Sequence, residues 1–288
     1  PQVKVYGEFV IRNGEFDLAV MGAGEEVLEQ LIMLHRRFTG KPDFLAEVLA
    51  QNGGSPLLQS ESGVADKLRT ADDRYRPSTI PNYRDQDLAG KILFHTIVDG
   101  FGCPWNKCNF CSHTRYHTIY QPRPVSQIIA EIKSVKEKGV AFLRFSSSDT
   151  PLLHGRQIAQ AILAEGIRIN YSMFTRPAKI TPERYEAYQI MIKAGLRAVF
   201  MGGETGHDMI NQVVMNKGAC RQDIIDTISC IRQAAASVGQ PCRIGLSLIY
   251  PCPTVEGVTL EDVFAENMRL IKETMPDTVI VNPPGAFP

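Results

Sequence analysis

The chain has 288 residues, of which 44% are hydrophobic, and its 31 basic residues balance 31 acidic ones. This length suits one large domain or a domain plus a fragment, and the balanced charge argues against recruitment by nucleic acid or an anionic membrane. No apolar run approaches the roughly 18 to 20 residues that span a bilayer, and the first residues lack the pattern of a signal peptide.

The N-terminal part contains one strand–turn–helix unit. An apolar strand over 18–21 leads through Gly22 and Gly24 into an amphipathic helix with Glu25 in its first turn. A lone strand cannot bury both of its faces, so we expect this unit to be the end of a larger domain. We place the C-terminal part of that domain at 1–50.

A polar stretch over 51–90, rich in Gly, Ser, Asp, Arg and Pro, is expected to be a connector. From residue 91 to 288 apolar strands alternate with amphipathic helices. The expected strands cover 92–98, 140–146, 167–174, 197–201, 243–250 and 277–281, and the expected helices cover 125–138, 155–165, 182–194, 206–214, 221–238 and 260–274. This alternation predicts an α/β fold with a parallel sheet wrapped by helices, a partial (β/α)6 TIM-like barrel.

Ligands of such barrels gather at the C-terminal ends of the strands. The polar residues at these ends are Ser147, Ser148 and Asp149 after the second strand, Arg176 after the third, Glu204 after the fourth and Ser247 in the fifth. Each alone is also what a strand-end turn or a helix cap contains. These residues are expected at the same end of the sheet as a cysteine-rich loop that follows the first strand, and this shared location favours a functional interpretation.

That loop carries Cys103, Cys108 and Cys111. Three thiolates at this spacing can hold three irons of a four-iron cluster and leave the fourth iron open. The alternatives are a disulfide with one spare cysteine, or a zinc site that uses His113 or His117, but the second Cys-x2-Cys pair of a zinc ribbon is missing. Seven cysteines, an odd number in a long chain, favour a reducing compartment, so we expect a cytoplasmic protein.

The loop sequence Cys-Pro-Trp-Asn-Lys-Cys-Asn-Phe-Cys, residues 103–111, resembles the cluster loop of radical S-adenosylmethionine (SAM) enzymes. Its first gap is four residues instead of the usual three, a form found in members that carry an N-terminal cobalamin-binding domain. Residues 194–206 and 214–218 are similar to the fourth strand and following helix of that group. Residues 17–33 are similar to the last strand and helix of its Rossmann-like cobalamin-binding domain.

Position by position, the resemblance implies that Cys103, Cys108 and Cys111 ligate a [4Fe-4S] cluster. The residues that it implies for contact with SAM are Phe110, Ser147, Ser148, Arg176, Glu204 and Ser247, and those for cobalamin are Gly22, Gly24 and Glu25. The two serines stand where the family has a Gly-Gly-Glu motif, so this chain lacks the glutamate of that motif. Whether Asp149 takes the place of the glutamate stays open. Whether Arg176 and Glu204 pair with SAM or with each other also stays open.

The resemblance implies an enzyme that cleaves SAM reductively to a 5′-deoxyadenosyl radical. Cobalamin-dependent methylation of an unactivated carbon is the reaction we expect. The alternatives are a radical SAM reaction without methyl transfer, such as cyclisation, epimerisation or rearrangement, and a non-catalytic metal-binding barrel. The expected partners are a small-molecule or peptide substrate and an electron donor such as flavodoxin or ferredoxin. A basic stripe with aromatics is lacking, so a nucleic-acid substrate is not indicated.

Overall fold

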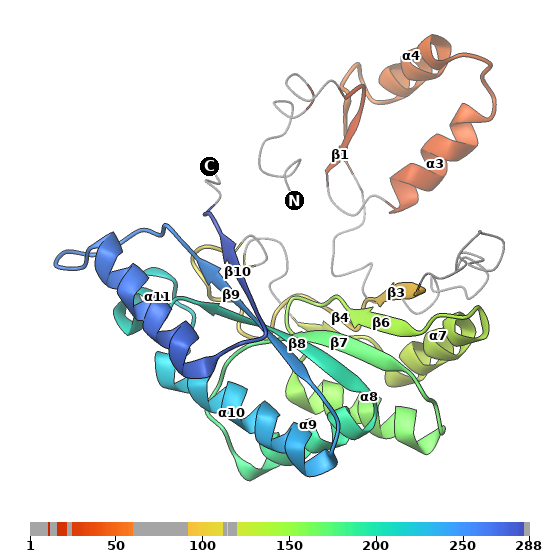
Figure 1. The fold of residues 1–288 in the computed structure, drawn as a ribbon. Helices are drawn as coiled ribbons and strands as arrows, with labels where there is room; N and C mark the ends of the chain where they lie inside the picture. Colours follow the sequence, from red (N-terminus) through yellow and green to blue (C-terminus); the bar gives the residue numbers. More distant parts are fainter. Residues whose placement is uncertain are drawn as a thin grey trace. The chain divides into compact units, whose positions relative to one another are not determined.

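The structure, a computed structural model, describes residues 11, 16–21, 25–59, 92–111, 114 and 120–284. The chain divides into two compact units, residues 1–74 with 285–288 and residues 75–284. Figure 1 shows both as ribbons. Within the described residues we find no helix with the length and apolar character that crossing a membrane requires.

In the described part of the N-terminal unit, strand β1 (Ala19–Met21) and strand β2 (Leu57–Gln59) pair in parallel. Helices α3 (Glu25–His35) and α4 (Lys41–Gln51) lie between them in the chain. The expected strand and helix at the start of the chain are therefore present. Strand β2 falls inside the stretch expected to be a connector, because three residues leave almost no periodic pattern to recognise.

The larger unit contains the expected parallel sheet of six strands. They pair in the order β10-β9-β8-β7-β6-β3, and every pair is parallel. The strands are β3 (Phe94–Ile97), β6 (Phe142–Phe145), β7 (Asn170–Thr175), β8 (Leu196–Glu204), β9 (Arg243–Ile249) and β10 (Thr278–Asn282). Neighbours in the sheet are neighbours along the chain, which is the strand order of a partial barrel.

Each crossover between these strands contains a helix that packs against the next one. The helices are α7 (Val125–Glu137), α8 (Leu152–Ala164), α9 (Pro182–Lys193), α10 (Arg221–Val238) and α11 (Leu260–Thr274). Consecutive helices contact each other from α7 to α11, and Figure 1 shows them along one face of the sheet. Helix α8 begins three residues before the expected start at 155, because the turn after β6 is short.

The core fills the space between the sheet and this helical layer. Alternate strand residues such as Leu143, Phe145 and Val199 pack against isoleucines of the helices, and all belong to one continuous buried cluster. Burial of these side chains is the main stabilising contribution of the unit, at about 1.5–3 kcal/mol for each large aliphatic residue. A rigid sheet of this kind fixes the positions at which its strands end.

Two small elements lie on the side where the strands end. Strands β4 (Gly100–Phe101) and β5 (Gln121–Pro122) pair antiparallel just after β3. The π-helical turn η3 (Ile210–Val214) follows β8, in the range where we expected a helix. Its wider turn is visible in the hydrogen bond from Met215 N to Ile210 O, 2.8 Å long and five residues apart.

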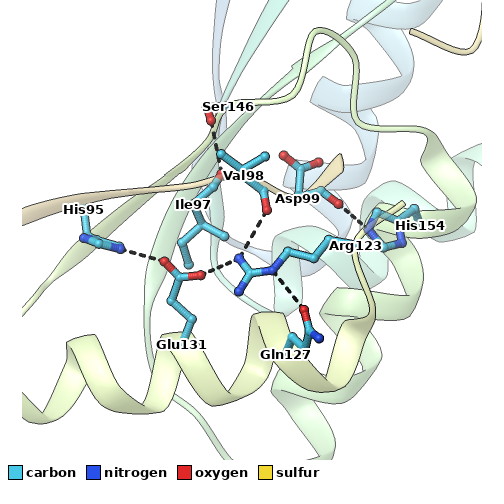
Figure 2. A network of polar contacts seen from close by, with 9 residues as sticks. All are labelled: His95, Ile97, Val98, Asp99, Arg123, Gln127, Glu131, Ser146 and His154. Carbon is cyan, nitrogen blue, oxygen red and sulfur yellow. Dashed lines mark hydrogen bonds and ion pairs between the residues drawn. The ribbon is translucent and has the colours of Figure 1, made fainter. Parts of the chain in front are cut away.

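A buried ionic network joins the sheet edge to α7. Arg123 contacts the carboxylate of Glu131 and donates to Val98 O at 3.3 Å and to Gln127 Oε1 at 3.4 Å. His95 Nε2 lies 2.9 Å from the other oxygen of Glu131. Figure 2 shows Arg123 between the helix and the end of β3. The network holds β5 and the start of α7 against the end of strand β3.

We predict that Glu131→Gln lowers the free energy of unfolding by about 3 kcal/mol, because it leaves the Arg123 charge buried without its counter-ion. Glu165→Gln is the matched control, since Glu165 pairs with Lys133 while both side chains are about half exposed (49% and 48%). That control should change stability by about 0.5 kcal/mol or less. Denaturant unfolding followed by circular dichroism measures both, and equal effects would contradict the prediction.

Candidate active site

The sheet brings the expected polar residues to one edge. The cysteine loop follows β3, Asp149 follows β6, Arg176 follows β7, Glu204 ends β8 and Ser247 lies in β9. Because all these strands are parallel and adjacent, their carboxyl ends meet on the same side of the sheet. The site described below lies among these strand ends.

The cysteine loop itself has almost no regular secondary structure, and hydrogen bonds to residues 214–218 hold its shape. Three of these bonds run from Asn109 N to Met215 O (3.0 Å), from Asn109 Nδ2 to Val214 O (3.0 Å) and from Asn216 Nδ2 to Lys107 O (2.8 Å). Both partners are therefore irregular segments that satisfy each other's polar groups. We call residues 214–218 the docking segment.

Trp105 is the centre of this contact. Its indole Nε1 donates to Asn216 O at 2.8 Å, and the guanidinium of Arg176 lies over the ring at 4.7 Å from its centroid. Lys107 lies 5.2 Å from the same ring. Gly218, at φ +66°, has no side chain where the indole packs, and a Cβ there would be 2.1 Å from the ring. Trp105 thus ties the cysteine loop to both the docking segment and the end of β7.

All three cysteines of the loop are free thiols, so the disulfide alternative for them is not what the structure contains. Burial raises the pKa of Cys108 to about 11, while the positive charges of Lys217 and Arg176 act in the opposite direction. Cys111 and Glu204 contribute to this rise. Cys103 and Cys111 are partly exposed. Without a bound metal the net rise keeps Cys108 protonated, and the two cations lessen the cost of forming the thiolate that metals bind.

Among the described residues, no three His, Cys, Asp or Glu side chains lie close enough together to hold a single metal ion. A four-iron cluster does not require such closeness, because each cysteine binds a different iron. The zinc alternative depended on His113 or His117, and both lie outside the described residues.

Glu204 forms a buried ion pair with Lys217, whose Nζ is 2.5 Å from Oε1, and the two side chains are only 9% and 7% exposed. Lys217 also lies 5.9 Å from the ring centroid of Phe110. In the structure the partner of Glu204 is therefore Lys217 and not Arg176, and a contact of either residue with SAM stays a prediction. Lys217 carried no recognisable signal beyond its place in the segment that resembles the family.

Arg176 combines several contacts. Its backbone N donates to Asp149 Oδ1 at 3.2 Å, and its guanidinium donates to Lys217 O. Its Nε is buried and has no hydrogen-bond partner in the part of the chain that the structure describes. Burial raises the pKa of Asp149, and the charges of Arg176 and Lys217 counteract this rise.

Asp99, fully buried between β3 and the cysteine loop, is a site residue that sequence reasoning missed. Its carboxylate accepts hydrogen bonds from Ser147 N (3.0 Å), Ser147 Oγ (2.8 Å) and Thr150 Oγ1 (2.8 Å). Its backbone oxygen lies 2.9 Å from Nε2 of His154. The structure thus directs the hydroxyl of Ser147 toward Asp99. An aspartate directly after an apolar strand and before the loop was the signal that could have identified it.

The remaining expected residues lie as follows. Ser148 is exposed, and the hydroxyl of Ser247 accepts a hydrogen bond from Asn282 Nδ2 at 2.8 Å. Gly22 and Gly24 are outside the described residues, and Glu25 is the first residue of α3.

The family model "Radical SAM superfamily" matches residues 97–250, which is more than half of the chain. The chain belongs to the radical SAM superfamily. Its matched region runs from the end of β3 to the end of β9 and contains the cysteine loop, the docking segment and the strand ends described above. The expected fold, a partial radical SAM barrel, is confirmed.

Among curated proteins, this radical SAM chain is 29% identical over 195 residues to the "Hopanoid C-3 methylase" of Methylococcus capsulatus. The match covers 67% of the chain and 36% of that protein, so the chain spans about a third of the length of its relative.

Two solved structures share the fold. The radical SAM methyltransferase TsrM from Kitasatospora setae, with tryptophan substrate and a SAM analog bound, has a TM-score of 0.54 and 16% identity over 66% of this chain and 35% of that one. The cobalamin-dependent radical SAM enzyme OxsB, with aqua-cobalamin bound, has a TM-score of 0.50 and 17% identity over 65% of this chain and 27% of that one.

We predict that Gly218→Ala displaces Trp105, because the new Cβ would overlap the indole. Trp105 is the one tryptophan of the chain, so its fluorescence reports directly on this contact. The emission maximum should move to longer wavelength as the indole becomes more hydrated.

Gly239→Ala is the matched control. Gly239 has almost the same backbone angle, φ +68°, but no atom lies within 4 Å of its added Cβ. Both variants therefore carry the strain of a left-handed alanine, about 1 kcal/mol. Only the first should change the emission, and an unchanged spectrum of Gly218→Ala would show that the contact is not as described.

Proposed function

We propose that this chain carries the catalytic core of a radical SAM enzyme that holds a [4Fe-4S] cluster through Cys103, Cys108 and Cys111 and cleaves SAM reductively. Membership of the superfamily supports the cluster and SAM as its cofactors. The observation that supports the proposal most is the cysteine loop fixed at the carboxyl edge of a parallel sheet, with two cations beside it.

The donor set fits such a cluster. Three free thiols lie within nine residues, and thiolates are the ligands that iron–sulfur clusters use. Lys217 and Arg176 provide positive charge next to Cys108, which stabilises the thiolate and the negative charge of a cluster. When bound, the cluster and SAM supply one-electron chemistry that yields a radical able to abstract hydrogen from carbon.

The neighbouring residues suit the amino-acid part of SAM. The buried Asp149 can receive the ammonium group, in the place of the glutamate that the family motif has and this chain lacks. Arg176 offers its unpartnered Nε to the carboxylate, while Trp105 and Lys217 O fix its guanidinium. Because these groups are held by the sheet ends before any ligand binds, little reorganisation is needed on binding.

The other contacts belong to the same proposal. Glu204, held by Lys217, is assigned to the ribose or the amino group, and Phe110 to the adenine. Ser147, Ser148 and Ser247 line the same strand ends. The hydroxyl of Ser147 donates to Asp99. Ser147 would therefore contact SAM either after its side chain rotates or through its backbone carbonyl oxygen.

Methylation of an unactivated carbon with cobalamin is the reaction that we favour. The "Hopanoid C-3 methylase" and the methyltransferase TsrM are similar to this chain, and OxsB binds cobalamin. Residues 1–50 are proposed as the end of a cobalamin-binding domain, with Gly22, Gly24 and Glu25 near the corrin. The substrate class is a small molecule or peptide, and the reductant is a low-potential carrier such as flavodoxin or ferredoxin in the cytoplasm.

The cluster assignment is tested by anaerobic reconstitution with iron and sulfide. Wild type should bind about four irons per chain and form 5′-deoxyadenosine from SAM after reduction. Replacing Cys103, Cys108 or Cys111 by Ala should reduce the iron content and abolish 5′-deoxyadenosine formation. Absorbance spectra, iron analysis and chromatography of the nucleoside give the three readouts.

Cys220→Ser is the matched control for these variants. Cys220 is partly exposed at the N-terminus of α10, outside the site, and serine is a better N-cap residue than cysteine. This variant should keep full iron content and at least wild-type stability. One bound zinc with no SAM cleavage in wild type would instead support a non-catalytic metal-binding barrel.

The presence of bound cobalamin, detected by the absorbance of its corrin ring, distinguishes methyl transfer from the other radical reactions. The full-length protein should show a corrin absorbance band and form S-adenosylhomocysteine as well as 5′-deoxyadenosine, which corresponds to two SAM molecules for each product. A full-length protein that cleaves SAM but binds no corrin would favour cyclisation, epimerisation or rearrangement.

A further inference from the structure

Tyr120 lies just before strand β5, next to the end of β3. Its ring packs against β4, where Gly100 provides the space. A Cβ on Gly100 would lie 2.6 Å from the hydroxyl oxygen and 3.0 Å from two ring carbons of Tyr120. The side chain therefore occupies a position that any other residue at 100 would obstruct.

The hydroxyl of Tyr120 is buried and has no hydrogen-bond partner in the described part of the chain. The carboxylate of Asp99, the residue before Gly100, already receives three hydrogen bonds from Ser147 and Thr150. A buried hydroxyl that loses water without gaining another partner is destabilising, and buried polar groups in folded proteins are nearly always paired. The described residues therefore leave this donor available to an acceptor from a ligand.

The chain that directly follows Tyr120 is anchored. Arg123, three residues later, donates its backbone N to Asp99 O at 3.0 Å. Its guanidinium is held by Glu131 and by Val98 O in the network of Figure 2. Strand β5 pairs with β4 immediately after Tyr120. These contacts, with the packing of the ring against Gly100, fix the side chain at the end of β3, where the charges of Asp99 and Asp149 act on it.

The charges at this position restrict what the hydroxyl can bind. Burial, and then the carboxylates of Asp99 and Asp149, raise the pKa of Tyr120, so the group stays protonated and acts as a donor. The same two carboxylates repel an isolated anion. The acceptor must therefore be an uncharged oxygen, or a carboxylate whose ligand also carries its own cation for Asp149.

We propose that Tyr120 donates its hydroxyl hydrogen bond to an oxygen of bound SAM, and so completes the site at the ends of β3 and β6. This inference rests on the proposed function, because SAM meets both conditions: it has uncharged ribose hydroxyls and a carboxylate next to an ammonium group. Tyr120 is then a ligand-contacting residue in addition to those implied by the motifs.

The first experiment compares Tyr120→Phe with Tyr171→Phe in the protein without cofactors. The hydroxyl of Tyr171 is buried and donates to Met191 O at 3.1 Å, so its removal leaves a carbonyl unpaired. Tyr171→Phe should lower the melting temperature by about 2–4 °C, whereas Tyr120→Phe should leave it unchanged or raise it. A decrease for Tyr120→Phe equal to that of Tyr171→Phe would mean that the hydroxyl has a partner within the fold, and would overturn the inference.

The second experiment measures SAM binding by titration calorimetry on the anaerobically reconstituted full chain with an oxidised cluster. Tyr120→Phe should weaken binding about fivefold to tenfold, the loss expected for one neutral hydrogen bond, and Tyr171→Phe should not. Equal affinity of Tyr120→Phe and wild type would overturn the inference. Absence of SAM binding by wild type would instead overturn the proposed function.

The part of SAM that receives the hydrogen bond is identified with two fragments. If the acceptor is a ribose hydroxyl, Tyr120→Phe weakens binding of 5′-deoxyadenosine and leaves L-methionine unaffected. If it is the carboxylate, the reverse holds. Either result supports the proposal and assigns the acceptor.

Discussion

The site depends on the contact between the cysteine loop and the docking segment 214–218. Apart from Val214, the last residue of η3, neither segment has a helix or strand that would fix its own shape, and each satisfies polar groups of the other through Asn109, Asn216 and the indole of Trp105. The loop begins at the edge strand β3, whereas the docking segment follows β8, three strands away in the sheet. The contact therefore crosses the carboxyl edge of the barrel and places Cys108 near the ends of β7 and β8.

Around this contact the protein buries charged groups of both signs in one small region. Lys217 pairs with Glu204, while the guanidinium of Arg176 donates to Lys217 O and lies over the Trp105 ring, and the Arg176 backbone N donates to Asp149. A buried charge destabilises a fold unless its partners replace water, so such an arrangement contributes little to stability by itself. Its value lies in the fixed electric field that it presents to ligands at the strand ends.

The sequence predicted the strands, most helices and the position of the cysteine loop because each has a local pattern. Apolar runs mark β6 to β10, and three cysteines at short spacing mark the loop. The partners of the site residues carried no such pattern. Asp99 and Lys217 are single residues whose roles arise from pairing across the sheet, and a serine opposite an aspartate resembles any strand-end turn. Strands β2, β4 and β5 were missed because two or three residues are too few to show a period.

The π-helical turn η3 has a consequence for how the two irregular segments meet. A π turn holds about one residue more than an α turn, so the chain that leaves it is rotated by roughly 100° from the direction that an α-helix would give. This rotation applies to the three residues that follow η3, which are Met215, Asn216 and Lys217. The extra residue in η3 therefore sets the angular position from which Met215 and Asn216 contact the cysteine loop.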